Sequence, residues 1–219
     1  MFKSKTLFAV GIAAALGLAA CGSDAESSSD DGDALVSCLV TDLAGIDDKS
    51  FNASSWQGVL DAIDAGDAAP EPESFYLESD TESDWQPNID QMVSQGCEHI
   101  VTVGFALDAV TQENAPENPD ITWTLVDVDM FDFTTDPPTD IVFDNVQELT
   151  YQTDEAAFLA GYVAASVTET GIVGTFGGAN FPTVSIFMDG LYYGVQHYNE
   201  VKGTDVQVLG WDPANPDTG

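Results

Sequence analysis

The sequence predicts an α/β fold in which parallel sheets carry helices on both faces. Two observations support this class. Short apolar runs that suit strands alternate with helical patterns from residue 34 onward, and the helical segments place their apolar residues on one face. Repeated β-α alternation is typical of parallel sheets joined by right-handed crossovers. The loops that follow successive strands then share one edge of the sheet, and open α/β sheets bind ligands at that edge.

The expected strands are short apolar runs. They are 34–41, 74–78, 99–103, 121–126, 141–143, 171–176 and 206–209. The expected helices lie between them, at 51–65, 84–95, 107–114, 151–167 and 183–198. Trp56, Val59, Leu60 and Ile63 form one stripe in the first helix, and Phe187, Leu191, Val195 and Tyr198 form one in the last.

The chain is expected to divide into two α/β lobes, 34–145 and 146–219. Phe143-Asp144-Asn145-Val146 precedes a long Ala-rich helix and reads as a crossover into a second unit. The second unit holds only two strands and two helices when the sequence stops in DPANPDTG. Because a doubly wound lobe normally has more strands, we expect the second lobe to be incomplete here.

Residues 1–20 read as a bacterial lipoprotein signal peptide. Lys3 and Lys5 precede an uncharged apolar run, and small residues stand directly before Cys21. We expect Cys21 to carry a diacylglycerol anchor rather than to follow an ordinary cleavage site by chance. Residues 21–33 hold small and acidic residues and are expected to form a flexible acidic tether. This layout predicts a protein held by lipid on the extracytoplasmic face of the cell membrane.

The composition is strongly acidic. The 38 Asp and Glu residues face only 4 Lys and no Arg, and loss of Lys3 and Lys5 takes the net charge from −34 to about −36. Nucleic-acid binding requires Lys and Arg patches, so this composition argues against it. The charge is spread along the chain, which suits a saline habitat where salt screens self-repulsion. Unfolding at low ionic strength would support that hypothesis, and full stability in dilute buffer would contradict it.

Cys38 and Cys97 remain after the anchor cysteine. Each lies at or near an expected core strand, so we expect two packed thiols rather than a bridge, although a disulfide is permitted outside the cytoplasm. His99 and His197 stand alone in the sequence, and no zinc-type spacing is present. The sequence therefore predicts no metal and no cofactor.

Residues 41–58 read TDLAGIDDKSFNASSWQG. This segment closely resembles the signature of the basic membrane protein family (the PnrA-like group), with Ala44 in place of a glycine. The resemblance continues in order through 104–109, 158–165, 177–182 and 187–190, and so covers nearly the whole body.

The resemblance implies a type I periplasmic-binding-protein fold, with two doubly wound lobes joined by a hinge and a ligand held between them. Family members of known function are lipoproteins that bind nucleosides for ABC import. The implied partners are therefore a nucleoside of the purine type and the permease and ATPase subunits of an importer. No catalysis is implied.

The resemblance also gives candidate ligand-binding residues. The family's aspartate contacts the base and its phenylalanine stacks on it, and these roles fall on Asp42 and Phe51. The further candidates are Ser50, Asn52, Phe105, Asp108 and Gly178. Each leading residue also has a structural interpretation: Phe51 as a core residue, Ser50 as a helix N-cap and Asp42 as a cap of backbone amides.

Other functions remain open at this stage. A sugar or a signalling metabolite would fit the same fold, which by itself does not specify a ligand. A nucleoside or glycoside hydrolase would use Asp42 with Asp47 or Asp48 as a carboxylate pair. No Ser-His-Asp order, phosphate loop or metal cluster supports an enzyme.

Overall fold

The computed structural model describes residues 34–132, 134–135, 139–178 and 180–216. The expected signal peptide, the anchor residue Cys21 and the tether at 21–33 lie outside the described residues. Among the described residues, none of the helices has the length and hydrophobicity that a membrane span requires.

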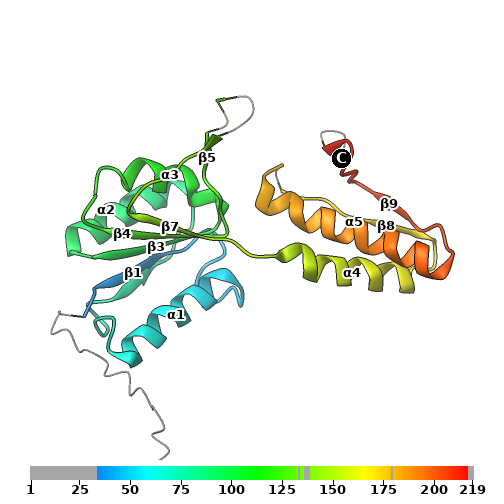
Figure 1. Cartoon of the computed structure of the whole chain (residues 1–219). Coiled ribbons are helices and arrows are strands. Elements are labelled where there is room, and N and C mark those ends of the chain that lie inside the picture. Colours follow the sequence, from blue (N-terminus) through cyan, green and yellow to red (C-terminus); the bar gives the residue numbers. More distant parts are fainter. Residues whose placement is uncertain (1–33, 133, 136–138, 179, 217–219) are drawn as a thin grey trace, which may run out of the picture. The chain divides into compact units, whose positions relative to one another are not determined.

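The first part of the chain forms a five-stranded parallel sheet in the order β2-β1-β3-β4-β7 (Figure 1). Its strands are β1 Ser37–Val40, β2 Phe75–Leu77, β3 His99–Val103, β4 Thr122–Val126 and β7 Val146–Leu149. Its helices are α1 Phe51–Ala65, α2 Trp85–Gln95 and α3 Asp108–Asn114. Two short 3-10 helices, η1 Glu82–Asp84 and η2 Phe105–Leu107, lead into α2 and α3.

Alternating side chains of the strands build a core on each face of this sheet. Cys38 and Val40 of β1 pack with Ile89 and Met92 of α2 on one face. Leu39, between them, packs with Trp56 and Val59 of α1 on the other face. The period-2 alternation of a strand explains this division, and it places α1 on one side of the sheet and α2 and α3 on the other (Figure 1).

The expected strand at 141–143 is wrong. After β4 the chain makes a short antiparallel pair, β5 Phe131–Asp132 with β6 Thr139–Asp140. Ile141 and Phe143 then pack as loop residues against Leu125, Val128 and Met130. The fifth strand is the next segment, β7, whose residues Val146–Leu149 pair with β4. This segment therefore belongs to the first sheet and not to the expected second lobe.

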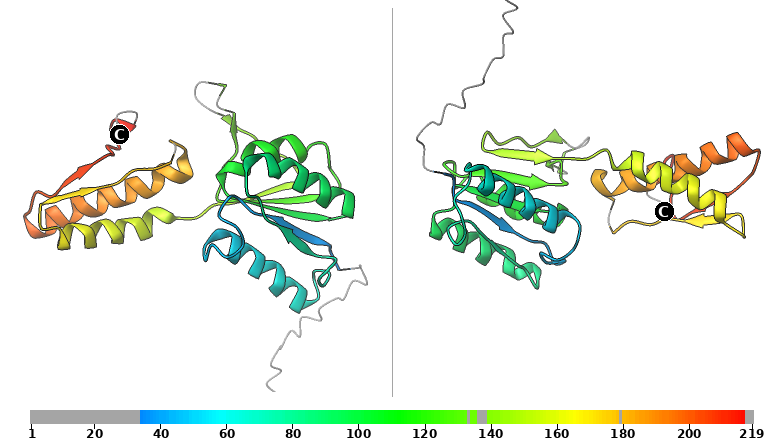
Figure 2. Two further views of the ribbon diagram at one scale, coloured as in Figure 1. Left: turned by 180° about the vertical axis from the view of Figure 1, so that it is seen from behind. Right: turned by 90° about the horizontal axis from the view of Figure 1, so that it is seen from below.

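The second part of the chain contains α4 Thr153–Val167, β8 Ile172–Gly174, α5 Pro182–Lys202 and β9 Gln207–Leu209. The two strands are parallel, and α5 connects them. The helices α4 and α5 lie side by side in both views of Figure 2. Three glycines allow this close approach, because a Cβ at Gly161, Gly190 or Gly194 would collide with backbone atoms of the opposite helix.

A disulfide joins Cys38 to Cys97, with Cα atoms 6.0 Å apart. The expectation of two separate thiols is therefore wrong. The two residues are 59 positions apart in sequence, but β1 pairs with β3, and Cys97 lies directly before β3 in the same core cluster as Cys38. The strand pairing brings the two sulfur atoms together.

Candidate functional site

The loops after β1 and β3 meet at the carboxyl edge of the first sheet. The chain runs from β1 out to β2, then returns to β3 and continues to β4 and β7. The strand order therefore reverses between β1 and β3, and the helices that follow these strands lie on opposite faces. Open α/β sheets form their ligand crevice at such a switch point. Hydrogen bonds hold this edge together, including Thr41 N–H to Leu77 O at 3.0 Å.

Asp42, two residues after β1, presents a fixed carboxylate at this edge. Its Oδ1 accepts hydrogen bonds from Ala44 N at 2.9 Å and from Asn52 Nδ2 at 2.7 Å. The described residues thus donate two hydrogen bonds to this carboxylate, and both go to the same oxygen. Oδ2 accepts no hydrogen bond from the described residues, so its lone pairs remain for a further donor.

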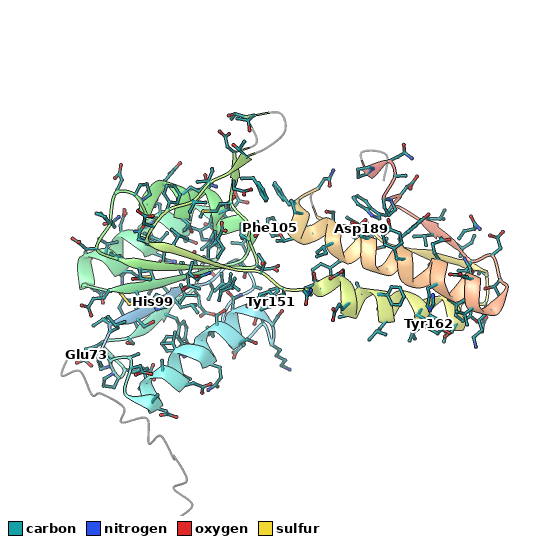
Figure 3. All side chains as sticks on the ribbon, in the orientation of Figure 1. Glu73, His99, Phe105, Tyr151, Tyr162 and Asp189 are labelled. Atoms are coloured by element: carbon teal, nitrogen blue, oxygen red, sulfur yellow. A yellow bond between two sulfur atoms is a disulfide. The ribbon has the colours of Figure 1, made fainter. Side chains whose placement is uncertain are left out.

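Gly104, directly after β3, lies beneath this carboxylate. A Cβ at Gly104 would be 3.3 Å from Asp42 Oδ2, and the glycine has a φ of 93°. Its N–H donates to Val126 O at 2.9 Å, which fixes the loop against β4. The next residue, Phe105, is exposed at the start of η2, and Figure 3 shows it at the same edge of the sheet as Tyr151.

Phe51 begins α1, and its ring is partly buried. One part of the ring packs on the core cluster around Trp56 and Val59. The ring of Tyr151, two residues after β7, lies 5.6 Å away with a tilt of 35°. Phe51 therefore combines the core contact of the structural interpretation with a position at the edge where a ligand is expected.

Ser50, a candidate ligand residue whose alternative role was a helix N-cap, lies at the N-cap position of α1, but its hydroxyl makes no capping hydrogen bond. Asp48 takes this role and accepts from the N–H groups of Ser50, Asn52 and Ala53. Burial raises the pKa of Asp48, but these bonds and one from the Asn52 side chain outweigh it and hold the pKa below its ordinary value. Asn52 itself is fully buried, so it acts within the protein on Asp42.

Asp108 follows η2, and Gly178 follows β8. Asp108 is the first residue of α3, and its Oδ1 accepts from Gln112 Nε2 at 2.8 Å. Burial raises its pKa, and the bond from Gln112 opposes the rise. Gly178 is exposed in the loop between β8 and α5, where a Cβ would meet no atom within 4 Å. Nothing around Gly178 requires a glycine.

Sequence reasoning missed two residues at this edge, Asp127 and Tyr151. Asp127 follows β4, as Asp42 follows β1, and has a φ of 63° that is rare for a residue other than glycine. Burial and the neighbouring Asp129 raise its pKa to about 6. The signal was present as a carboxylate at a strand end, and strained backbone with a perturbed pKa is enriched at functional sites.

A groove of about 450 Å³ lies beside α1 on the face of the sheet. It is lined mostly by apolar atoms, with a polar row in which His99 bonds to Ser37 and Thr124 at 2.8 and 2.9 Å. Phe51 and Tyr151 also line it. Parallel sheets normally carry helices on both faces. Among the described residues, α1 covers only part of the face on which the groove lies. The groove therefore reflects the open sheet face, and the strand-end residues, rather than the groove, mark the edge where a ligand is expected.

The described residues contain no cluster of three or more His, Cys, Asp or Glu side chains that could hold a metal ion.

The fold is that of the solute-binding proteins of ABC transport systems. The chain superimposes on a solute-binding protein from Aeropyrum pernix with a TM-score of 0.61 at 24% identity, over 80% of this chain and 46% of that one. The arabinose-binding protein AraP from Geobacillus stearothermophilus gives a TM-score of 0.53 at 14% identity, over 81% of this chain and 56% of that one. These likenesses establish the periplasmic-binding-protein architecture.

The family model for ABC transporter substrate-binding proteins of the PnrA-like type matches residues 35–214. The chain belongs to this family, which confirms the resemblance in its sequence motifs. An antigen of Listeria innocua that stimulates CD4+ T cells is 30% identical over 201 residues, 90% of this chain and 54% of the relative. The ABC transporter nucleoside-binding protein BmpA of Lactococcus lactis is 29% identical, over 80% of this chain and 47% of the relative. The chain thus spans about half the length of these relatives.

Proposed function

We propose that the protein is a lipid-anchored, extracytoplasmic solute-binding protein of an ABC importer and that it captures nucleosides, most favourably purine nucleosides. The observation that carries this proposal is the Asp42 carboxylate at the switch point, held on one oxygen by Asn52 and Ala44, with the ring of Phe51 at the same edge. The name of the Lactococcus lactis relative supports the choice of ligand.

The chemistry of a nucleoside matches these groups. A base presents N–H donors along its edge, which a carboxylate oxygen such as Asp42 Oδ2 accepts. A base also has two flat faces, and stacking on an aromatic ring contributes about 1–3 kcal/mol per base in nucleic-acid complexes. Phe51 supplies such a ring, and Tyr151 lies beside it.

The acidic edge favours a neutral ligand. Asp42, Asp108 and Asp127 follow three neighbouring strands, and the chain has only 4 Lys and no Arg to neutralise an anion. A nucleoside carries no phosphate, whereas a nucleotide would bring like charge toward these carboxylates. The proposed ligand class is therefore the nucleoside and not its phosphate ester.

Titration calorimetry of the complete gene product with a panel of purine and pyrimidine nucleosides tests the proposal. Phe51→Ala should weaken nucleoside binding by about 1–3 kcal/mol, and Asp42→Asn should weaken it at least as much. Tyr193→Ala and Asp61→Asn are controls, because both side chains are exposed on helices and neither belongs to the loops after β1, β3 and β4. Absence of binding to every nucleoside in the panel would remove the ligand assignment.

The same variants separate the two alternatives. A sugar or signalling metabolite gains support if Phe51→Ala leaves affinity unchanged while Asp42→Ala abolishes binding. A hydrolase would release free base from a nucleoside, which chromatography of the incubated mixture detects. We expect intact nucleoside, since the proposed role is capture and delivery to permease and ATPase subunits.

Release of the protein from membranes tests the anchor. Cys21→Ser should move the protein from the membrane fraction to the medium if Cys21 carries the lipid. Asp61→Asn leaves Cys21 and the Cys38–Cys97 disulfide in place and serves as the comparison.

A further inference from the structure

Asp48 lies in the loop between β1 and α1 and accepts four hydrogen bonds. Its Oδ1 accepts from Ser50 N at 2.8 Å and Ala53 N at 3.0 Å. Its Oδ2 accepts from Asn52 twice, from the backbone N at 3.0 Å and from the side-chain Nδ2 at 3.1 Å. One oxygen thus accepts from Ser50 and Ala53, while the other accepts both donors of Asn52.

Asn52 bridges two carboxylates. Its Nδ2 carries two hydrogens, and these go to Asp48 Oδ2 and to Asp42 Oδ1. Because an ionised carboxylate can only accept, the amide orientation is fixed. The amide Oδ1 on the other side is buried without a hydrogen-bond partner. Leaving a buried acceptor unpaired costs free energy, and the two charge-assisted bonds from Nδ2 offset that cost.

Asp42 depends on this bridge for its orientation. The bond from Asn52 is the shorter of its two protein hydrogen bonds, and it comes from a fully buried side chain at the start of a rigid helix. With Oδ1 held in this way, Oδ2 lies over Gly104.

We propose that Asp48 is a positioning residue of the ligand site: through the amide of Asn52 it fixes the Asp42 carboxylate so that Oδ2 faces a hydrogen-bond donor of the ligand. This inference rests on the proposed function only for the identity of the ligand. The relay Asp48–Asn52–Asp42 makes the β1–α1 loop part of the recognition machinery, although Asp48 itself touches no ligand.

A plain helix cap is the competing role for Asp48. Asp48→Asn keeps a carbonyl oxygen that can still cap Ser50 and Ala53, but it also loses the cap of the Asn52 backbone N–H. Asn52→Leu keeps all three backbone caps and removes only the side-chain relay, so the two variants together separate the two roles. The new amide nitrogen replaces the oxygen that accepts from Asn52, so donor faces donor and the relay breaks. Asp47→Asn removes the same charge from the exposed neighbouring residue and is the matched control.

Calorimetry with adenosine, guanosine and inosine on the complete gene product measures the consequence. We expect Asp48→Asn to weaken binding about ten-fold, a loss of the size seen when residues that orient the ligands of a metal ion are mutated. Asp47→Asn should leave binding unchanged. The losses should not add: Asp48→Asn in an Asp42→Asn background should weaken binding no further. Additive losses, or unchanged affinity in Asp48→Asn, would overturn the proposal. If Asp48→Asn does not fold, Asn52→Leu breaks the same relay with the Asp48 cap intact and should give the same loss.

A crystal structure of the Asp48→Asn variant without ligand decides the positioning step by itself. We expect the Asp42 side chain to leave its wild-type rotamer or to lose order. An unchanged Asp42 and Asn52 would refute the relay whether or not any nucleoside binds. A displaced Asp42, together with a wild-type protein that binds no nucleoside, would instead retain the relay and remove the nucleoside assignment.

Discussion

Asp42 Oδ2 lies 3.3 Å from the position that a Cβ would occupy at Gly104. The carboxylate after one strand therefore rests on the backbone after the neighbouring strand. The glycine also has a φ of 93°, a conformation that disfavours side chains. The backbone conformation and the close contact with Asp42 both favour glycine at this position.

Gly104→Ala should destabilise the fold and displace the carboxylate. We expect a loss of about 1–3 kcal/mol in the free energy of unfolding, from backbone strain and from the contact with Asp42. Gly66→Ala is the matched control, since Gly66 has a φ of 85° with no atom within 4 Å of a Cβ. Urea unfolding should show a loss in both variants, whereas calorimetry should show weaker ligand binding only in Gly104→Ala. Equal affinities would contradict the role of this contact.

Asp127 should make the stability depend on pH. Burial and Asp129 raise the pKa of Asp127 from 3.8 to about 6. The folded protein therefore keeps this proton at pH values where the unfolded chain has lost it. Because the folded state binds more protons, protonated Asp127 contributes to the free energy of unfolding. This contribution is fully present below about pH 4 and is lost as pH rises through about 6. Asp127 is partly exposed, so solvent screening reduces the loss to about 1–2 kcal/mol.

Asp127→Asn tests this sign, because asparagine tolerates the same backbone conformation. Relative to wild type, the variant should gain stability between pH 4 and pH 7 in urea unfolding. Burial lowers the pKa of His99, and that group acts in the opposite direction, so the comparison is between variants at each pH. Asp64→Asn removes the same charge from the exposed side of α1 and is the control for the loss of a charge as such. A constant difference between wild type and Asp127→Asn across this range would rule out the effect.

The regular elements were largely predictable from local pattern. The expected helix at 51–65 and the expected strand at 99–103 match α1 and β3, because amphipathic spacing and short β-branched runs carry their own signal. The strand β7 was missed because Val146–Leu149 reads V-Q-E-L. Its edge position leaves alternate residues to solvent, whereas Ile141 and Phe143 are more apolar and pack as loop residues.

Only the site residues that lie within the sequence motif at 41–58 were predictable. Asp42, Asn52 and Phe51 lie within ten positions of one another, and the structure brings them to one edge. Asp127 and Tyr151 join that edge only through strand pairing between distant segments. The role of Asp48 depends on which oxygen accepts from which donor, and residue spacing alone does not determine this.

The Cys38–Cys97 disulfide should contribute strongly to stability. It closes a loop of 59 residues, for which the chain-entropy model gives about 4 kcal/mol. The double variant Cys38→Ala with Cys97→Ala should lose about that much in urea unfolding, plus a small loss of packing. Adding reductant should lower the stability of the wild-type protein and leave that of the variant unchanged. Titration of two free thiols in the unfolded, unreduced protein would contradict the bridge.

The contact between α4 and α5 should tolerate no side chain at Gly194. A Cβ there would collide with Phe158 O of the opposite helix, and two backbones that meet this closely cannot yield as a flexible side chain would. We expect Gly194→Ala to cost about 1–3 kcal/mol in urea unfolding, as overpacking does, despite the better helix propensity of alanine. Gly58→Ala is the control, because Gly58 also lies inside a helix but has open space around its Cβ position. That variant should gain about 0.5–1 kcal/mol. A gain in both variants would show that the helices separate without cost, and a loss in both would show that helix position rather than the α4–α5 contact sets the effect.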